Sequence, residues 1–158
     1  MKKHVAAFLF AAAMIAMQTA AAEDKIADVT DMQALRNAVR SGKKAFVAST
    51  LNLSDAEAKK FWPAYDAYQR HLDVTNRERT IAVEVSIATD KPVSDLYARN
   101  MAKALIAIDE AEVKARRTLH NNVLKALPAK KAARYLQLEA KIRAVQAFDV
   151  ASVIPLVK

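Results

Sequence analysis

Apolar side chains recur every three or four residues along residues 51–72, which is the spacing of one face of an α-helix. Ser54, followed three residues later by Glu57, forms a capping-box pattern that predicts where this helix begins. Its apolar face carries Ala58, Phe61, Trp62, Tyr65, Tyr68 and Leu72. The pattern predicts a helix over 55–88, bent at Pro63 because proline removes a backbone hydrogen bond.

The end of this helix has an ambiguous pattern. Residues 81–87 alternate between apolar and other residues, with apolar side chains at Ile81, Val83, Val85 and Ile87. Alternation of this kind is typical of a strand. The segment continues the helix directly, and the chain offers no partner strand, so we expect it to be helical.

A helix is also expected before this segment. Thr30 and Gln33 form a second capping pattern, and apolar spacing continues to about Thr50. Gly42 interrupts this stretch and predicts a break or bend, because glycine is unfavourable inside a helix.

Two more helices are expected after it. Residues 89–93 form a turn, and Ser94 is placed to cap a long amphipathic helix that ends near Leu127. Pro128 can occupy the first position of a last helix, which reaches about Phe148.

These elements predict an all-α fold of four helices. The second and third helices are long and joined by a short turn, so they should form an antiparallel hairpin. The N-terminal and C-terminal helices would pack on that hairpin, and the assembly could be dimeric. The composition agrees: the 158 residues include one Gly, four Pro and no Cys, and 53% are hydrophobic but only 6% aromatic.

The first 22 residues have the pattern of a secretory signal peptide. A basic start at Lys2 and Lys3 precedes a short apolar run, and small residues at 20–22 supply a cleavage site. We predict cleavage near Ala22, a single all-helical domain over 23–158, and a periplasmic location. The apolar run is too short for a comfortable membrane span, so no stable membrane insertion is expected after cleavage.

The charge of the chain is basic. Its formal net charge is +8, and removal of Lys2 and Lys3 would lower this to +6. In an exported protein this charge does not point to nucleic acid. It could attract anionic lipid, acidic polymers or unfolded chains, or it could only keep the protein soluble.

Two residue groups are candidates for contact with other proteins. The aromatic stripe is either core, which is the commoner role, or a protein-binding or dimer face. The basic group is either a set of capture positions or a solvated face with local ion pairs. The stripe comprises Phe61, Trp62, Tyr65, Tyr68 and Leu72, and the capture positions are Arg77, Arg79, Arg116 and Arg117.

Residues suited to chemistry are few. The hairpin register places His71 opposite about residue 111, where Asp109 or Glu112 could join it in a weak metal site. A surface histidine is the alternative, because a metal site needs three or more convergent ligands. Basic residues could clamp a dicarboxylate, as in exported chorismate mutases, but no catalytic motif is visible. We therefore predict no enzyme activity, no metal and no cofactor.

The segment 53–57, Leu-Ser-Asp-Ala-Glu at a helix start, resembles the LTxxQ motif of the periplasmic Spy/CpxP-like family of all-helical stress proteins. The resemblance covers about Leu51 to Phe148. The segments FWPAYDAY and LPAKKAARYLQLEAKI are also similar to other exported relatives of that group. Glu57 stands where the motif has Gln, and Pro128 and Lys131 replace the Thr and Gln of a second motif.

The resemblance implies a helical hairpin that dimerises into a curved cradle. It also implies ATP-independent chaperone action or envelope-stress signalling, without catalysis. The expected partners are unfolded or partner proteins, with a homodimer as an option. The alternative functions are a periplasmic metal-responsive sensor and, less favoured, a small helical enzyme of the chorismate mutase type.

Overall fold

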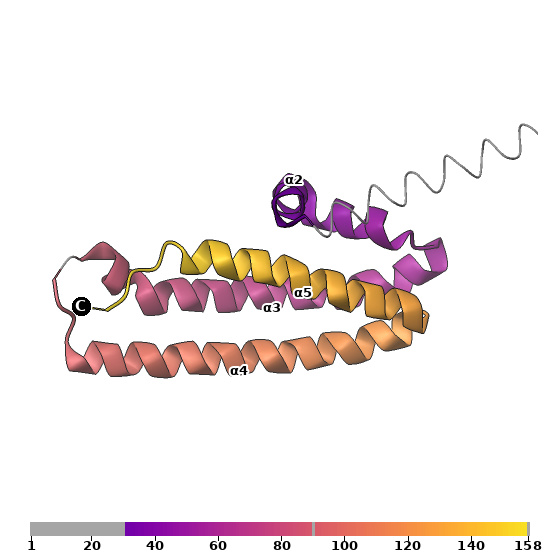
Figure 1. Ribbon diagram of the computed structural model, residues 1–158. Helices are drawn as coiled ribbons and strands as arrows, with labels where there is room; N and C mark the ends of the chain where they lie inside the picture. The colour runs from indigo at the N-terminus through magenta and orange to yellow at the C-terminus, as the bar shows by residue number, and fades with distance from the viewer. Residues whose placement is uncertain (1–30, 90, 158) are drawn as a thin grey trace, which may run out of the picture. The chain divides into compact units, whose positions relative to one another are not determined.

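The computed structural model describes residues 31–89 and 91–157, and every regular element in these residues is a helix. The elements are α2 (Met32–Leu51), α3 (Asp55–Ala88), α4 (Asp95–Ala126) and α5 (Ala129–Ala151) (Figure 1). The predicted all-α fold class is therefore confirmed for the described part of the chain. The predicted signal peptide and the expected cap at Thr30 lie outside the described residues.

The chain divides into two compact units, residues 1–50 and residues 51–158, where the sequence predicted one domain over 23–158. Nearly all of α2 belongs to the first unit. Its start is capped by Asp31, whose Oδ1 accepts hydrogen bonds from the backbone N–H groups of Gln33 (2.8 Å) and Ala34 (3.2 Å). Gly42 has a non-helical backbone (φ 159°, ψ 87°) inside α2, so the predicted break is confirmed.

The start of α3 is fixed by the predicted capping box. Ser54 Oγ accepts a hydrogen bond from the Glu57 backbone N–H at 3.4 Å, and Glu57 Oε2 accepts one from the Ser54 backbone N–H at 2.8 Å. These bonds satisfy N–H groups that a helix start leaves without a partner. α3 then runs for 34 residues, continues through Pro63, and includes the alternating segment 81–87.

α3 and α4 form the predicted antiparallel hairpin (Figure 1). Ser94 caps α4 by accepting a hydrogen bond from the Tyr97 backbone N–H, and the Tyr97 hydroxyl donates to the Ala82 carbonyl at 2.8 Å. Farther from the turn, His71 Nε2 lies 3.2 Å from the carbonyl oxygen of Ala111. The register expected from the sequence, with His71 opposite about residue 111, is thus confirmed.

α5 packs along the hairpin and begins beside the start of α3. Lys131 Nζ donates to the carbonyl of Asn52 at 2.9 Å and pairs with Glu57 at 2.6 Å. Asn52 has φ 45°, a left-handed conformation that asparagine tolerates better than most residues. These contacts attach the fourth predicted helix to the hairpin.

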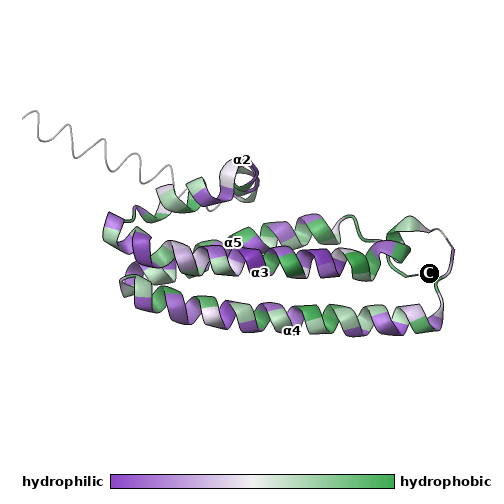
Figure 2. Cartoon of the chain, turned by 180° about the vertical axis from the view of Figure 1, so that it is seen from behind, coloured by the Kyte–Doolittle hydropathy of each residue, from purple (hydrophilic) through white to green (hydrophobic). Residues whose placement is uncertain are grey.

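The core of this unit comes from all three helices. Figure 2 shows apolar residues alternating with polar ones along each of them. The buried apolar side chains include Phe61, Tyr65, Tyr68, Leu72 and Val83 of α3, Ile108, Leu119 and Val123 of α4, Leu127, and Ala132, Tyr135, Leu138, Ile142 and Val145 of α5. Within the described residues, no helix combines the length and the apolar run that crossing a membrane requires.

Candidate functional site

The predicted aromatic face of α3 lies mostly in the core. Phe61, Tyr65, Tyr68 and Leu72 each expose 7% or less of their surface. The Phe61 ring meets Tyr135 of α5 edge to face, with the ring centroids 4.8 Å apart. Of the two roles that the sequence left open, the structure gives these four side chains the core role. They are therefore packed inside the bundle and expose little surface.

Trp62 is the aromatic residue of this face that stays partly exposed. Its ring lies 5.0 Å from that of Phe61 and 5.3 Å from that of Tyr65, in edge-to-face arrangements. Burial raises the pKa of Tyr65 and of Tyr135 far above the ordinary tyrosine value. These hydroxyls stay protonated at neutral pH, so the cluster is suited to packing and not to proton transfer.

An ionic network connects the three helices of the hairpin unit. Arg79 of α3 pairs with Asp109 at 2.9 Å and with Glu112 at 3.1 Å, both on α4. Arg143 of α5 pairs with Glu112 at 2.5 Å and donates to the Tyr68 hydroxyl at 3.0 Å. Glu112 is buried, with 8% exposure, and a buried carboxylate is tolerated only with such partners.

The electrostatics of this network favour a structural role. Burial by itself raises the pKa of Glu112, but the hydrogen bonds and charges of Arg143 and Arg79 outweigh it, so the pKa lies below its ordinary value. Glu112 therefore remains ionised at neutral pH. An ionised carboxylate held by two guanidinium groups ties helices together and has no proton to give.

The predicted capture positions separate into two groups. Arg79 is engaged by Asp109 and Glu112 in the network. Arg77, Arg116 and Arg117 are exposed, and none of the three makes an ion pair with a described residue. Three of the four positions are thus accessible to an acidic partner.

The metal hypothesis placed His71 with Asp109 or Glu112. The structure brings His71 against the carbonyl of Ala111, while Arg79 contacts both carboxylates. Among residues 31–89 and 91–157, no group of three His, Cys, Asp or Glu side chains could hold a metal ion.

A row of exposed apolar side chains follows α4 on the side away from the core. This α4 outer row consists of Ile106, Val113 and Leu124, which expose 61%, 39% and 47% of their surface. Their spacings of seven and eleven residues are about two and three helical turns, so they lie nearly in line. Core residue Ile108 is two positions from Ile106, about 200° around the helix. α4 is therefore apolar on two opposite sides.

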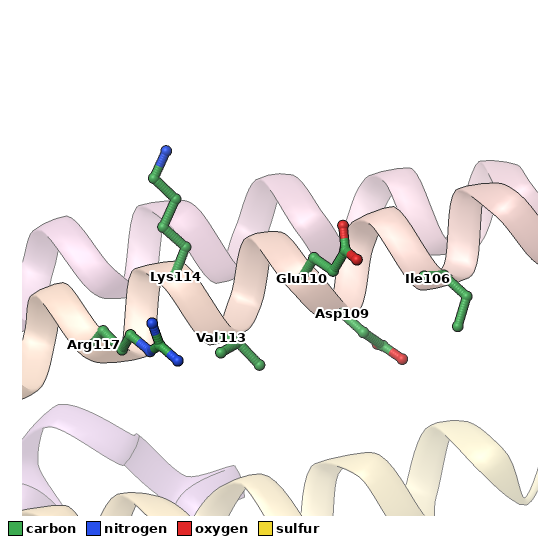
Figure 3. A pocket seen from close by; sticks show the side chains of 6 residues that line it. All are labelled: Ile106, Asp109, Glu110, Val113, Lys114 and Arg117. Atoms are coloured by element: carbon green, nitrogen blue, oxygen red, sulfur yellow. The ribbon is translucent and has the colours of Figure 1, made fainter.

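An open hollow of about 540 Å³ lies along this row. Figure 3 shows the six side chains that line it, all from α4, with Ile106, Val113 and Arg117 along one side of the helix. Because the described lining comes from a single helix, the hollow is a surface feature and not an enclosed pocket. Apolar contact and positive charge thus occur together here.

A similar row occurs on α3. The α3 outer row consists of Val74, Ile81 and Val85, with exposures of 42%, 65% and 42%. Sequence analysis did not single out either outer row, because it followed the main apolar stripe of each helix. The pattern that could have found them is apolar residues repeating at four, seven and eleven positions on the polar side.

Comparisons of this chain with protein families, with curated proteins and with solved structures find no match.

Proposed function

We propose that this protein is an exported, non-catalytic binding protein that holds other proteins, in the manner of a chaperone or a stress-response accessory. The proposal places it in the periplasm, on the strength of the signal-peptide pattern in residues 1–22. The resemblance of residues 53–57 to the LTxxQ motif supports the same function.

The observation that carries the proposal is the α4 outer row. Ile106, Val113 and Leu124 expose apolar surface on a helix whose opposite side is already buried in the core. Exposed apolar surface rimmed by polar residues is typical of protein interaction sites. The α3 outer row adds a second such strip, so the hairpin offers apolar contact over much of its length.

Positive charge supplies the second part of the proposal. Arg117 lines the same hollow as Ile106 and Val113. Two further exposed arginines lie close in sequence to the outer rows: Arg116 is next to Arg117 on α4, and Arg77 lies between Val74 and Ile81 on α3. A net positive charge attracts acidic or unfolded chains over a distance and speeds their encounter. Apolar contacts would then hold the bound chain, so added salt should weaken capture more than it weakens the apolar contact.

The test is the aggregation of an unfolded client protein, followed by light scattering with the purified protein at rising ratios. We expect suppression at near-stoichiometric ratios, and less suppression at high salt. The variant Ile106→Ser, Val113→Ser, Leu124→Ser should lose most of the suppression, because it removes the α4 outer row.

The matched control is Val150→Ser, Val153→Ser, Leu156→Ser, which removes three exposed apolar side chains near the C-terminus. We expect this control to behave like the wild type. Equal loss in both triple variants, or no suppression by the wild type at any ratio, would contradict the proposal.

A further inference from the structure

A second hollow lies between α3 and α4. Its volume is about 440 Å³, and α5 contributes none of the described residues that line it. The α3 side is lined by Ala64, Ala67, Tyr68 and His71, and the α4 side by Ala111, Lys114, Ala115, Thr118, Leu119 and Asn122. We call this hollow the hairpin groove.

The walls of the hairpin groove are made of small side chains. Four of its ten lining residues are alanines, two on each helix. The distance between packed helices is set by the side chains at their contact, about 8–10 Å, and small residues permit the short end of that range. The floor is formed in part by Tyr68 and Leu119, which expose 3% and 2% of their surface. The groove is thus a shallow apolar channel along two helices.

Positive charges lie along the α4 side of the groove: Lys114 is the lysine among its described lining residues, and Lys103 and Lys125 lie beyond the two ends of that lining. Lys103, Lys114 and Lys125 repeat at eleven-residue intervals, about three helical turns, so they lie along one side of α4. All three are exposed, and none makes an ion pair with a described residue. Two of the α4 carboxylates, Asp109 and Glu112, are turned toward arginines of α3 and α5, whereas Glu110 is exposed four residues before Lys114. We call the three lysines the lysine row.

We propose that the hairpin groove binds an amphipathic α-helix of another protein, whose apolar side chains enter the groove and whose flanking aspartate or glutamate residues meet the lysine row. The inference rests on the protein-binding function proposed above, and it names a partner class and a surface distinct from the α4 outer row. A helix fits because a groove between two antiparallel helices takes a third helix along its length, as in a four-helix bundle.

Charge complementarity favours an acidic partner over a second copy of this chain. If two grooves packed on each other about a twofold axis that runs across the groove, the α4 helices would lie on each other and the lysine rows would face each other, with Lys114 of each copy near the centre. Like charges opposed in an interface are unfavourable. A lipid surface is also a poor match for the groove, because a flat headgroup layer contacts its rims and leaves the alanine channel unfilled.

The test uses a fluorescein-labelled peptide of about five helical turns, with leucine and alanine on one face and glutamate on both flanks. The comparison peptide has lysine in place of every glutamate. Fluorescence anisotropy with the full chain should show that the glutamate peptide binds and that salt weakens this binding. The lysine peptide should bind with an affinity that is lower by about tenfold or more. Equal affinity for the two peptides would overturn the proposal.

Two variants locate the site. Lys103→Glu, Lys114→Glu, Lys125→Glu should weaken the glutamate peptide about tenfold or more, and should strengthen the lysine peptide. Ala67→Trp places a large side chain in the groove from an exposed position, and should abolish binding of both peptides. The matched charge control is Lys91→Glu, Lys130→Glu, Arg134→Glu, three exposed positions outside the groove lining. If this control loses as much affinity for the glutamate peptide as the lysine variant, the binding depends on net charge alone, and the proposed groove site is wrong.

The remaining arms separate this inference from the proposed function. The Ile106→Ser, Val113→Ser, Leu124→Ser variant should keep its affinity for the glutamate peptide even where it fails to suppress client aggregation. Sedimentation should show the same oligomeric state for the wild type and for the Ala67→Trp variant. Vesicles of anionic phospholipid should not compete with the peptide for the wild-type protein. A dimer that is lost in the Ala67→Trp variant would show that a second copy of the chain occupies the groove. Full competition by vesicles would show that lipid occupies it, and either result would overturn the proposal.

Discussion

The two ends of the hairpin are built from the same two helices but differ in what they bury. At the base, near the start of α3, aromatic rings interlock: Phe61 contacts Tyr135, and Tyr65 lies 6.3 Å from Tyr135 between ring centroids. Toward the turn, the buried positions of α3 are Val83 and the small polar residue Ser86, whose hydroxyl lies 3.5 Å from the sulfur of Met101.

The exposed apolar residues are distributed in the opposite way. Ile81 and Val85 of α3 and Leu96 of α4 are all exposed near the turn. At the base, the large apolar side chains of α3 are covered by α5. Burial of large side chains is the main source of stability. In α3 it is therefore concentrated toward the base and the accessible apolar surface toward the turn, whereas the α4 outer row extends to Leu124 near the base.

The largest expected effect tests the base against the turn within one helix. Phe61→Ala should lower the free energy of unfolding by about 3–5 kcal/mol, because it removes a fully buried aromatic ring and leaves a cavity. Ile81→Ala should change it by only about 0.5 kcal/mol, since Ile81 is 65% exposed. Urea unfolding followed by circular dichroism measures both. Comparable losses in the two variants would mean that Ile81 is buried in solution.

An intermediate effect is expected in the ionic network between these ends. Glu112→Gln should lower the free energy of unfolding at pH 7 by about 1–3 kcal/mol, because it weakens the bonds to Arg143 and Arg79. Glu110→Gln is the matched control, since Glu110 is exposed on the same helix and makes no ion pair with a described residue. An equal loss of unfolding free energy in both variants would show that the ion pairs of Glu112 do not stabilise the fold.

The same network predicts a pH dependence with a defined sign. Because the pKa of Glu112 is lower in the folded protein than its ordinary value of 4.5, its contribution is present above pH 4.5 and is lost as the pH falls through the folded pKa. Wild-type stability should therefore fall on acidification below pH 4.5 more than that of Glu112→Gln. Parallel pH profiles of the two proteins, from urea unfolding, would contradict this.

The smallest effects compare the two helix caps, one at each end of the hairpin. Ser54→Ala should cost about 1 kcal/mol, and Ser94→Ala should cost less, because Ser54 takes part in a reciprocal capping box whereas the Ser94 side chain accepts one hydrogen bond. Ser54→Asp should retain most of the stability, since aspartate also caps helices. Thermal unfolding of the three variants measures these losses of stability. A larger loss in Ser94→Ala than in Ser54→Ala would contradict the prediction.

The elements of the fold could be predicted because their determinants are local. Ser54 with Glu57, Ser94 with Tyr97, and Gly42 act within a few residues along the chain, so the sequence shows them directly. The hairpin register followed from the lengths of two helices and one turn, and it placed His71 correctly against Ala111.

The surface could not be predicted in the same way, because exposure depends on which side of each helix its neighbours cover. Phe61 and Ile81 lie on the same helix, and only the position of α5 shows that the first is core and the second is accessible. Arg79 looked equivalent to Arg77 in the sequence, but Asp109 and Glu112, thirty or more positions away, engage it. The hairpin groove likewise requires both helices to be in place.

The position of residues 155–157 beside the hairpin turn has a practical consequence. Pro155, Leu156 and Val157 lie with Ser86 and Ile87 around one small hollow, so residues 155–157 lie beside the turn (Figure 1). The start of α3 is about 51 Å away along a helix of 34 residues. A dye or a surface linkage attached at Val157 therefore holds the bundle by its turn, and a second dye near Ser54 would report the end-to-end length of the hairpin as molecules bind.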